Sequence, residues 1–325
     1  MVILAIETSC DDTAVAILEK KGKQLKILSN IVSSQVKLHA KHGGIWPFLA
    51  KREHQKNLPV IFKRAMKMAK NPKIDAMAVT EGPGLEPCLW VGINFAKDLA
   101  KKLKTPLMPI NHIEGHIMAN FIENDSASIK FPVVCLIVSG GHTQLILMKD
   151  WLKYKKIGET RDDAAGECFD KTARILGLGY PGGPAISKMA KHNKAKITLP
   201  RPMINQDNYD FSFSGLKTAV LYNYKSQAKK SKTYIESMCF EIQQSIIDVL
   251  LKKTIKAARH YKAKTILLGG GVVANKELRK QFKLKLKAIM PKPSFCTDNA
   301  AMIGTAAFLH KKTKRKIEAK ANLEL

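Results

Sequence analysis

The fold is indicated most directly by the stretch Val133-Val134-Cys135-Leu136-Ile137-Val138-Ser139-Gly140-Gly141-His142-Thr143-Gln144-Leu145-Ile146-Leu147-Met148. Its two apolar runs predict two strands, and the small polar and glycine residues between them predict a turn. The chain opens with a similar unit, in which residues 2–6 and 14–18 are apolar and residues 7–13 are polar. Two such units about 130 residues apart predict an internal duplication.

The remaining segments alternate between strand-like and helix-like patterns. Strands are expected at 74–79 and 265–268, and helices at 48–70, 89–103, 162–176, 216–229, 232–261, from about 275, and at 300–312. Strand-loop-helix order of this kind predicts an α/β fold. The polar segment 124–130 indicates a subdomain boundary, and the very basic tail at 311–320 is expected to be frayed.

Charge and cysteine spacing restrict the setting of the protein. The 325 residues carry a formal net charge of +28, most of it from lysine. This charge is explained either by a polyanionic partner or by lysine-rich composition over all exposed surfaces, and charge alone does not decide. The six cysteines form no CxxC pair, and no apolar stretch is long enough to span a membrane. We expect a cytoplasmic protein with no membrane segment.

Three glycine-rich turns are candidates for binding a nucleotide. They comprise residues 139–141, 182–183 and 269–271, and two of them directly follow predicted buried strands. Glycine allows the backbone to approach a ligand closely, and amides at such turns or at a helix start can bind phosphate. A single glycine turn is most often only a turn, but three together favour a nucleotide. Neither the P-loop nor the Rossmann glycine pattern is present.

His112 and His116 are candidates for a metal site, since residues four apart share one face of a helix. The glutamate of this segment is Glu114, so the pattern is not the HExxH of zinc proteases. Spacing alone does not distinguish metal ligands from two unligated histidines. Asp298 is a candidate third ligand, although an aspartate before a helix is also typical of an N-cap. Asp11 is open to a similar choice between a polar role in the site and turn formation.

Taken together, the motifs of this chain resemble the TsaD family, also called Gcp or YgjD, of tRNA threonylcarbamoyladenosine transferases. The resemblance runs from Met1 to about Leu309, with the motifs in the same order. It rests on the segments IETSCDDT at 6–13, GPGL at 82–85, HIEGH at 112–116, VSGGHT at 138–143, FDK at 169–171, YPGGP at 180–184, DFSFSGLK at 210–217, GGV at 270–272 with Asn275, and CTDN at 296–299.

The resemblance implies a duplicated actin-like or Hsp70-like ATPase fold, of the ribonuclease H-like type, with two α/β subdomains and a central cleft. We place the N-terminal subdomain at 1–129, completed by a C-terminal helix over 300–325. The second subdomain is expected at 130–299, with a helical insertion at about 150–262.

The resemblance also implies a reaction. The threonylcarbamoyl group of threonylcarbamoyl-AMP is transferred to N6 of adenosine 37, in tRNAs that read ANN codons, and AMP is released. His112, His116 and Asp298 are expected to hold one divalent metal, iron or alternatively zinc, and Asp11 to be a polar catalytic residue near it. The expected nucleotide-binding residues, at a site that could also accept ATP or AMP, are Ile137, Val138, Ser139, Gly140, Gly141, Asp170, Gly183 and Asn275.

The partners implied by the resemblance are tRNA and, for a bacterial protein, TsaB-like and TsaE-like subunits; a mitochondrial-type relative would instead be a homodimer. The chain departs from the family pattern at Phe48, where an acidic residue is usual after the proline. Glu86-Pro87-Cys88 likewise replaces small residues. These differences bear on loops and partner contacts, whereas the metal and nucleotide motifs are intact.

Three alternative functions would require a different site in the sequence. A sugar-kinase-like ATPase of the same fold would bind magnesium through carboxylates and water, which does not suit a pair of histidines. A non-catalytic relative acting as a partner subunit would lack the histidine pair. A glycoprotease would need an HExxH-like site or a nucleophile triad, and neither is visible in the sequence.

Overall fold

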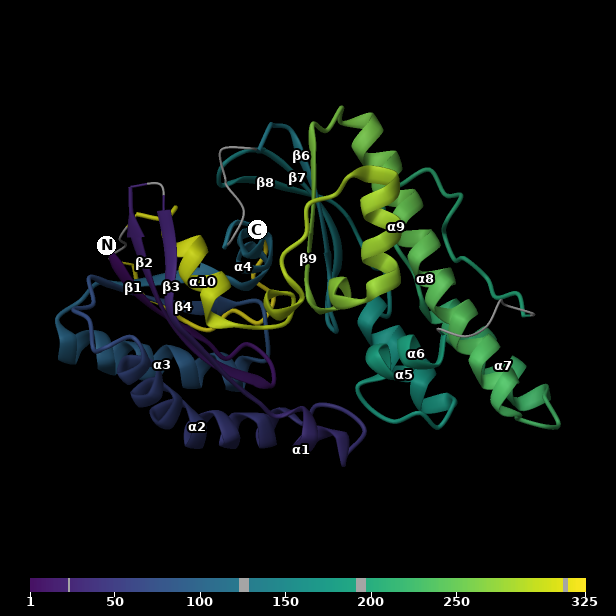
Figure 1. The fold of residues 1–325 in the computed structure, drawn as a ribbon, viewed down its shortest axis with the longest axis horizontal. Helices are drawn as coiled ribbons and strands as arrows, with labels where there is room; N and C mark the ends of the chain where they lie inside the picture. Colours follow the sequence, from purple (N-terminus) through teal and green to yellow (C-terminus); the bar gives the residue numbers. More distant parts are fainter. Residues whose placement is uncertain (23, 123–128, 191–196, 312–314) are drawn as a thin grey trace. The chain divides into compact units, whose positions relative to one another are not determined.

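The computed structural model describes residues 1–22, 24–122, 129–190, 197–311 and 315–325 (Figure 1). The chain divides into two compact units, one formed by Met1–Ala127 with Pro291–Leu325 and the other by Ser128–Met290. Most of the expected boundary segment at 124–130 lies outside the described residues. Residues 291–299, which were expected in the second subdomain, belong to the first unit.

The first unit is built on a five-stranded sheet with the order β3-β2-β1-β4-β5. Its strands are β1 (Val2–Glu7), β2 (Asp12–Lys21), β3 (Gln24–Ser34), β4 (Ala76–Gly82) and β5 (Leu107–Asn111). Its helices are α1 (Val36–Ala40), α2 (Pro47–Met68), α3 (Glu86–Leu103), α4 (His112–Met118) and α10 (Ala300–Ala307), with short 3-10 turns η1 (Ala119–Phe121) and η5 (Pro293–Phe295).

The second unit has a four-stranded sheet with the order β8-β7-β6-β9. The strands are β6 (Val133–Val138), β7 (Thr143–Asp150), β8 (Lys153–Glu159) and β9 (Thr265–Gly269). The helices are α5 (Ala165–Ile175), α6 (Gly182–Met189), α7 (Ser214–Ser226), α8 (Lys232–His260) and α9 (Lys276–Leu286), and a 3-10 turn η4 (Gly271–Ala274) precedes α9.

The two sheets share one topology, which confirms the predicted duplication. In each sheet three antiparallel strands run in chain order, and the first of them also pairs in parallel with a later strand. β1 therefore corresponds to β6, and β4 corresponds to β9. Strand β8 was not predicted, because its lysine-rich sequence has no apolar run.

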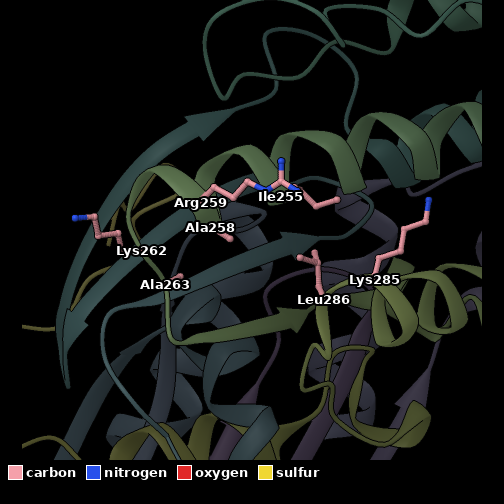
Figure 2. A pocket seen from close by; sticks show the side chains of 7 residues that line it. All are labelled: Ile255, Ala258, Arg259, Lys262, Ala263, Lys285 and Leu286. Carbon is pink, nitrogen blue, oxygen red and sulfur yellow. The ribbon is translucent and has the colours of Figure 1, made fainter.

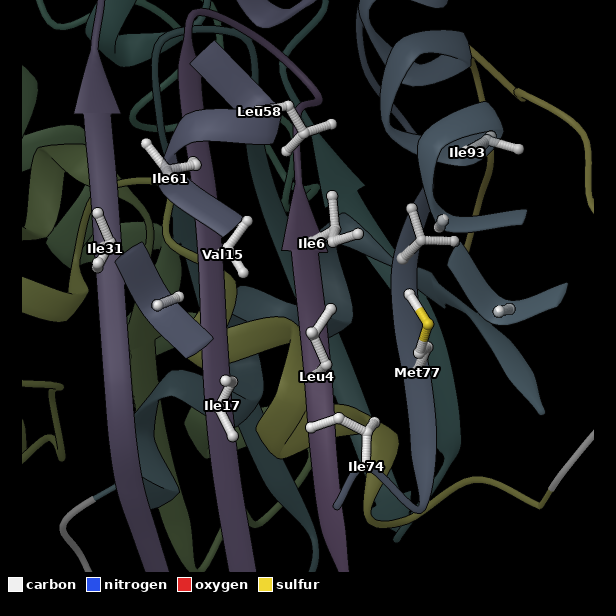
Figure 3. Close-up of a cluster of buried hydrophobic side chains, with 14 of the residues drawn as sticks. Leu4, Ile6, Val15, Ile17, Ile31, Leu58, Ile61, Ile74, Met77 and Ile93 are labelled. Atoms are coloured by element: carbon white, nitrogen blue, oxygen red, sulfur yellow. The ribbon is translucent and has the colours of Figure 1, made fainter. Parts of the chain in front are cut away.

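A buried aliphatic cluster holds the first sheet against its helices. Leu4, Val15 and Met77, from three neighbouring strands, face side chains of α2 and α3 (Figure 3). Most of these residues are fully buried, and burying an aliphatic side chain of this size contributes roughly 1.5–3 kcal/mol. This core fixes β1 and β4, the strands whose carboxyl ends lead into the site.

The C-terminal segment differs from the prediction. Helix α10 ends at Ala307, so the expected helix over 300–325 is wrong for most of its length. Residues 315–320 are also not frayed, because Ile317 is buried in the core and both guanidinium Nη atoms of Arg315 donate to Glu81. The basic composition of the tail gave no indication of these two anchors.

Candidate functional site

The two histidines lie on α4, which begins where β5 ends. The side-chain oxygen of Asn111 caps this helix by accepting hydrogen bonds from the backbone amides of Ile113 at 2.8 Å and Glu114 at 3.3 Å. All residues of α4 are buried, and the ring centroids of His112 and His116 are 4.6 Å apart. The histidines therefore form a buried pair on one face of a capped helix.

Asp298 joins the histidine pair from a distant part of the chain. Its Oδ1 atom lies 3.6 Å from His112 Nε2 and 3.3 Å from His116 Nε2. Asn299, and not Asp298, is the N-cap of α10, since its side-chain oxygen accepts from the amide of Met302 at 3.1 Å. The alternative role of Asp298 as the helix cap is therefore wrong, and its carboxylate faces the two imidazoles.

Close packing of α10 against α4 makes this convergence possible. A β-carbon added at Gly115 would lie 2.8 Å from Ile303 Cδ1 and 3.2 Å from Met302 Cγ. Glycine between the two histidines thus allows the helices to approach closely, and the start of α10 brings Asp298 to the histidine face.

The donor atoms of His112, His116 and Asp298 suit a divalent metal. One ligand atom from each residue lies within 4.8 Å of the other two. Ligands about 2.1 Å from a tetrahedral ion are roughly 3.4 Å apart, close to the two nitrogen–oxygen distances above. Both ring nitrogens of His116 are buried and make no well-oriented hydrogen bond to the described residues, although Nε2 lies 3.3 Å from Asp298 Oδ1. Such unsatisfied nitrogens are costly without a ligand, so the site fits a metal.

A buried carboxylate behind His112 was not predicted as part of the site. Glu7, the last residue of β1, is fully buried, and its Oε2 lies 3.1 Å from His112 Nδ1. The same carboxylate accepts hydrogen bonds from the Ser9 amide at 2.5 Å and from Thr80 Oγ1 at 2.6 Å. Metal-binding histidines usually donate their second ring N–H to such a group. Only the position of Glu7 at the end of a buried strand could have suggested this role.

The charges around the histidines give them different proton affinities. Burial opposes protonation of His112, but the carboxylates of Asp298 and Glu7 outweigh it and raise its pKa to about 9. Burial lowers the pKa of His116, and the contact with Asp298 offsets this only in part. The pocket is therefore rich in negative charge and attracts one cation, either a proton or a metal ion.

Asp11 lies in the turn between β1 and β2, in the same unit as the three candidate ligands. A buried histidine of α2 holds this turn: His54 Nε2 lies 2.9 Å from the Cys10 carbonyl oxygen, and its Nδ1 lies 2.8 Å from Thr13 Oγ1. Because burial lowers the pKa of His54, its neutral form can donate to the carbonyl and accept from the hydroxyl. The turn that carries Asp11 is consequently fixed at both ends.

In the second unit, residues 139–141 form the turn between β6 and β7. The Ser139 amide donates to the His142 carbonyl at 2.8 Å, and Ile137 and Val138 are buried at the end of β6. The start of α5 lies against this turn, because a β-carbon on Gly166 would be 2.5 Å from the Ser139 carbonyl oxygen. Gly140 and Gly141 have open space beside them. The first amides of α5 already donate within the protein, from Ala165 to Thr143 Oγ1 at 2.9 Å and from Gly166 to the Ser139 carbonyl at 3.1 Å. The open glycine turn itself is therefore the part that can bind phosphate.

The other expected nucleotide residues lie at helix starts of this unit or, in the case of Asp170 within α5, in contact with one. Asp170 Oδ1 accepts from the Gly182 amide at 2.7 Å at the beginning of α6, and Gly183 has open space for a ligand. Asn275 caps α9, since its side-chain oxygen accepts from the Glu277 and Leu278 amides, both at 3.0 Å. Its amide nitrogen donates to Gln243, a residue that the sequence did not indicate.

The comparison with known proteins identifies the family. The family model described as "TsaD: tRNA N6-adenosine threonylcarbamoyltransferase" matches residues 26–305. The chain belongs to this family. A TsaD relative from Thermosipho africanus is 48% identical and is aligned over the whole of both chains. Another, from Syntrophomonas wolfei, is 48% identical over 95% of this chain and 92% of its own. As a TsaD family member, the chain is a transferase that modifies adenosine in tRNA.

Solved structures confirm the fold prediction. Full-length HypF matches with a TM-score of 0.61 at 12% identity. The match covers 95% of this chain and 55% of HypF. Component A of the (R)-2-hydroxyglutaryl-CoA dehydratase of Acidaminococcus fermentans has a TM-score of 0.55 at 12% identity, with 95% and 96% of the two chains covered. At such identities the likeness shows the actin-like ATPase fold alone. Among the described helices of the TsaD chain, none is both long and apolar enough to cross a membrane.

Proposed function

We propose that the chain transfers the threonylcarbamoyl group of threonylcarbamoyl-AMP to N6 of adenosine 37 in tRNAs that read ANN codons, with AMP as the leaving group. The convergence of two buried imidazoles and one carboxylate, in a chain of the TsaD family, carries this proposal. A mixed anhydride of AMP needs no covalent enzyme intermediate, because its leaving group is already good. The protein then has to position the donor and orient the weakly nucleophilic adenine amine.

His112, His116 and Asp298 would hold one divalent metal in the first unit. Iron(II) is the proposed ion, with zinc as the alternative, since two imidazoles and a carboxylate suit both. When bound, the ion supplies Lewis acidity toward an oxygen of the donor. Glu7 would keep the His112 proton on Nδ1, so that Nε2 presents its lone pair to the ion. Asp11, held in its turn by His54, is proposed as a polar residue that orients the transferred group.

The adenylate would bind to loops of the second unit. The open turn at Ser139, Gly140 and Gly141, with the start of α5 against it, supports a phosphate site, to which Ile137 and Val138 contribute the strand end. One carboxylate oxygen of Asp170 accepts from the Gly182 amide, and the other is proposed to bind the ribose. Gly183 lies at the start of the same helix, α6. Asn275, fixed by its cap and by Gln243, is proposed to lie near the adenine.

The proposed setting is the cytoplasm, with tRNA as the macromolecular substrate and TsaB-like and TsaE-like subunits as partners; a mitochondrial-type homodimer is the alternative. All six cysteines are free, which suits a reducing compartment.

Substitution of both metal-site histidines tests the proposal. The His112→Ala/His116→Ala variant should lose bound metal, measured by elemental analysis, and should form no threonylcarbamoyladenosine in a reconstituted reaction analysed by nucleoside mass spectrometry. The matched control is His260→Ala, an exposed histidine of the second unit. Full activity in the double variant, with folding intact, would refute the metal role.

A further inference from the structure

A basic pocket lies where α8 and α9 end in the second unit. Its volume is about 440 Å³, and Figure 2 shows the seven side chains that line it. The lining residues are Ile255, Ala258, Arg259, Lys262, Ala263, Lys285 and Leu286. No carboxylate is among them, and none of the residues expected to bind the nucleotide belongs to this set.

The three cations of the pocket have no acidic partner. Arg259, Lys262 and Lys285 are exposed and form no ion pair with any residue that the structure describes. By contrast Lys256, one turn earlier on α8, is paired with Asp207. Positive charge near the end of α8 is thus left uncompensated at the pocket, where an anionic ligand could neutralise it.

Helix capping does not account for these cations. The end of α8 is closed by its own backbone, since the Ala263 amide donates to the Ala258 carbonyl at 2.9 Å and Lys262 has a left-handed φ of 49°. The end of α9 is closed in the same way by the amide of Lys287, which donates to Lys283 at 3.1 Å. Each helix end carries about half a negative charge, so three full positive charges exceed what the two ends attract.

The mixed lining of the pocket favours a phosphate ester over a free inorganic ion. Ile255, Ala258, Ala263 and Leu286 add apolar lining against which a sugar can pack. The Arg259 guanidinium can bind phosphate oxygens in a bidentate manner, and the two lysines add point charges on either side (Figure 2). Alternating sugars and phosphates are the repeating chemistry of a nucleic-acid backbone.

We propose that this pocket binds the sugar–phosphate backbone of the tRNA substrate, through Arg259, Lys262 and Lys285. The inference rests on the proposed function and adds to it a specific surface for the RNA. It assigns part of the net charge of +28 to a defined site, whereas most of the lysines remain general surface charge.

The test uses the full-length chain in the reconstituted modification system. The variant Arg259→Gln/Lys262→Gln/Lys285→Gln removes three charges from the pocket. The control Lys26→Gln/Lys101→Gln/Lys102→Gln removes three exposed charges from the other unit. Affinity for tRNA is measured between about 50 and 200 mM salt, and thermal melting checks that both variants fold.

We expect the pocket variant to bind tRNA about tenfold more weakly at low salt. We also expect its slope of log affinity against log salt to fall by about 2–3, since each lost phosphate contact lowers the slope by nearly one. A slope equal to that of the control variant would overturn the proposal. The pocket variant should bind AMP and inorganic phosphate as the wild type does. Loss of AMP binding with unchanged tRNA binding would assign the pocket to a free nucleotide and would also overturn the proposal.

The same preparations separate this proposal from the function on which it rests. If the wild-type chain forms no threonylcarbamoyladenosine, the proposed function fails. If it forms the product and the pocket variant keeps the wild-type salt slope, only the pocket assignment fails.

Discussion

Glu7 Oε2 lies 3.1 Å from His112 Nδ1, and both side chains are buried. Ser9 Oγ is also 3.1 Å from this nitrogen. A buried carboxylate at Nδ1 holds the proton there and leaves Nε2, which faces Asp298, as the metal-binding atom. The carboxylate also makes the imidazole a stronger base and therefore a stronger ligand.

Substitution Glu7→Gln should weaken metal binding about 10- to 100-fold. The amide has one oxygen in place of two, so it cannot accept from Ser9, Thr80 and His112 as the carboxylate does. Competition with a chelator measures the affinity, and thermal melting verifies the fold. Thr80→Val, which removes one hydrogen bond to Glu7 without altering His112, should have a smaller effect. Unchanged metal affinity in Glu7→Gln would show that Glu7 has no orienting role.

Two glycines near Ser139 should respond differently to alanine. Gly166→Ala places a β-carbon 2.5 Å from the Ser139 carbonyl oxygen, so it should lower both Tm and AMP affinity, the latter by about tenfold. Gly140→Ala meets no protein atom within 4 Å and should lower AMP affinity without changing Tm. Calorimetry gives both quantities. Normal AMP binding by both variants would place the nucleotide elsewhere.

Asp12 should destabilise the metal-free protein above neutral pH. Burial raises its pKa from the ordinary 3.8 to about 7, so the unfolded chain releases this proton at lower pH than the folded chain does. Stability is therefore lost as pH rises from about 4 to 7, and the full loss persists above 7. Asp12→Asn should melt about 5 °C higher than the wild type at pH 8, with little difference at pH 4. Asp98→Asn, at an exposed site, is the control; a gain independent of pH would contradict the assignment.

Arg315 should anchor the C-terminal segment through Glu81. The Glu81 side chain is only 2% exposed, and two of its hydrogen bonds, both 2.6 Å, come from Arg315. In Arg315→Ala, the buried Glu81 carboxylate keeps one ion pair among the described residues, with Lys320 at 3.8 Å. We expect this variant to lose about 1–2 kcal/mol of unfolding free energy. Lys316→Ala, at an exposed lysine, should change little. If Glu81→Gln restores stability to the Arg315 variant, the penalty comes from the unpaired charge.

The sequence by itself determined the strands other than β8, most helices and the duplication. These depend on local apolar periodicity, which is readable over ten residues, as in Val133–Val138 and its return strand. The spacing of His112 and His116 likewise determined that both lie on one face of a helix. Spacing alone did not decide whether that face holds a metal, because isolated histidines at this separation are common.

The tertiary structure alone decided which groups meet at that face. Asp298 reaches the histidines because α10 packs closely on α4 at Gly115. Glu7 reaches His112 because β1 pairs with β4, and β4 pairs with β5, the strand that leads into α4. Ile317 and Arg315 anchor a tail whose composition predicted fraying. In each case the contact joins residues far apart in the chain. Local pattern carries no information about such pairs, since packing of the whole unit brings them together.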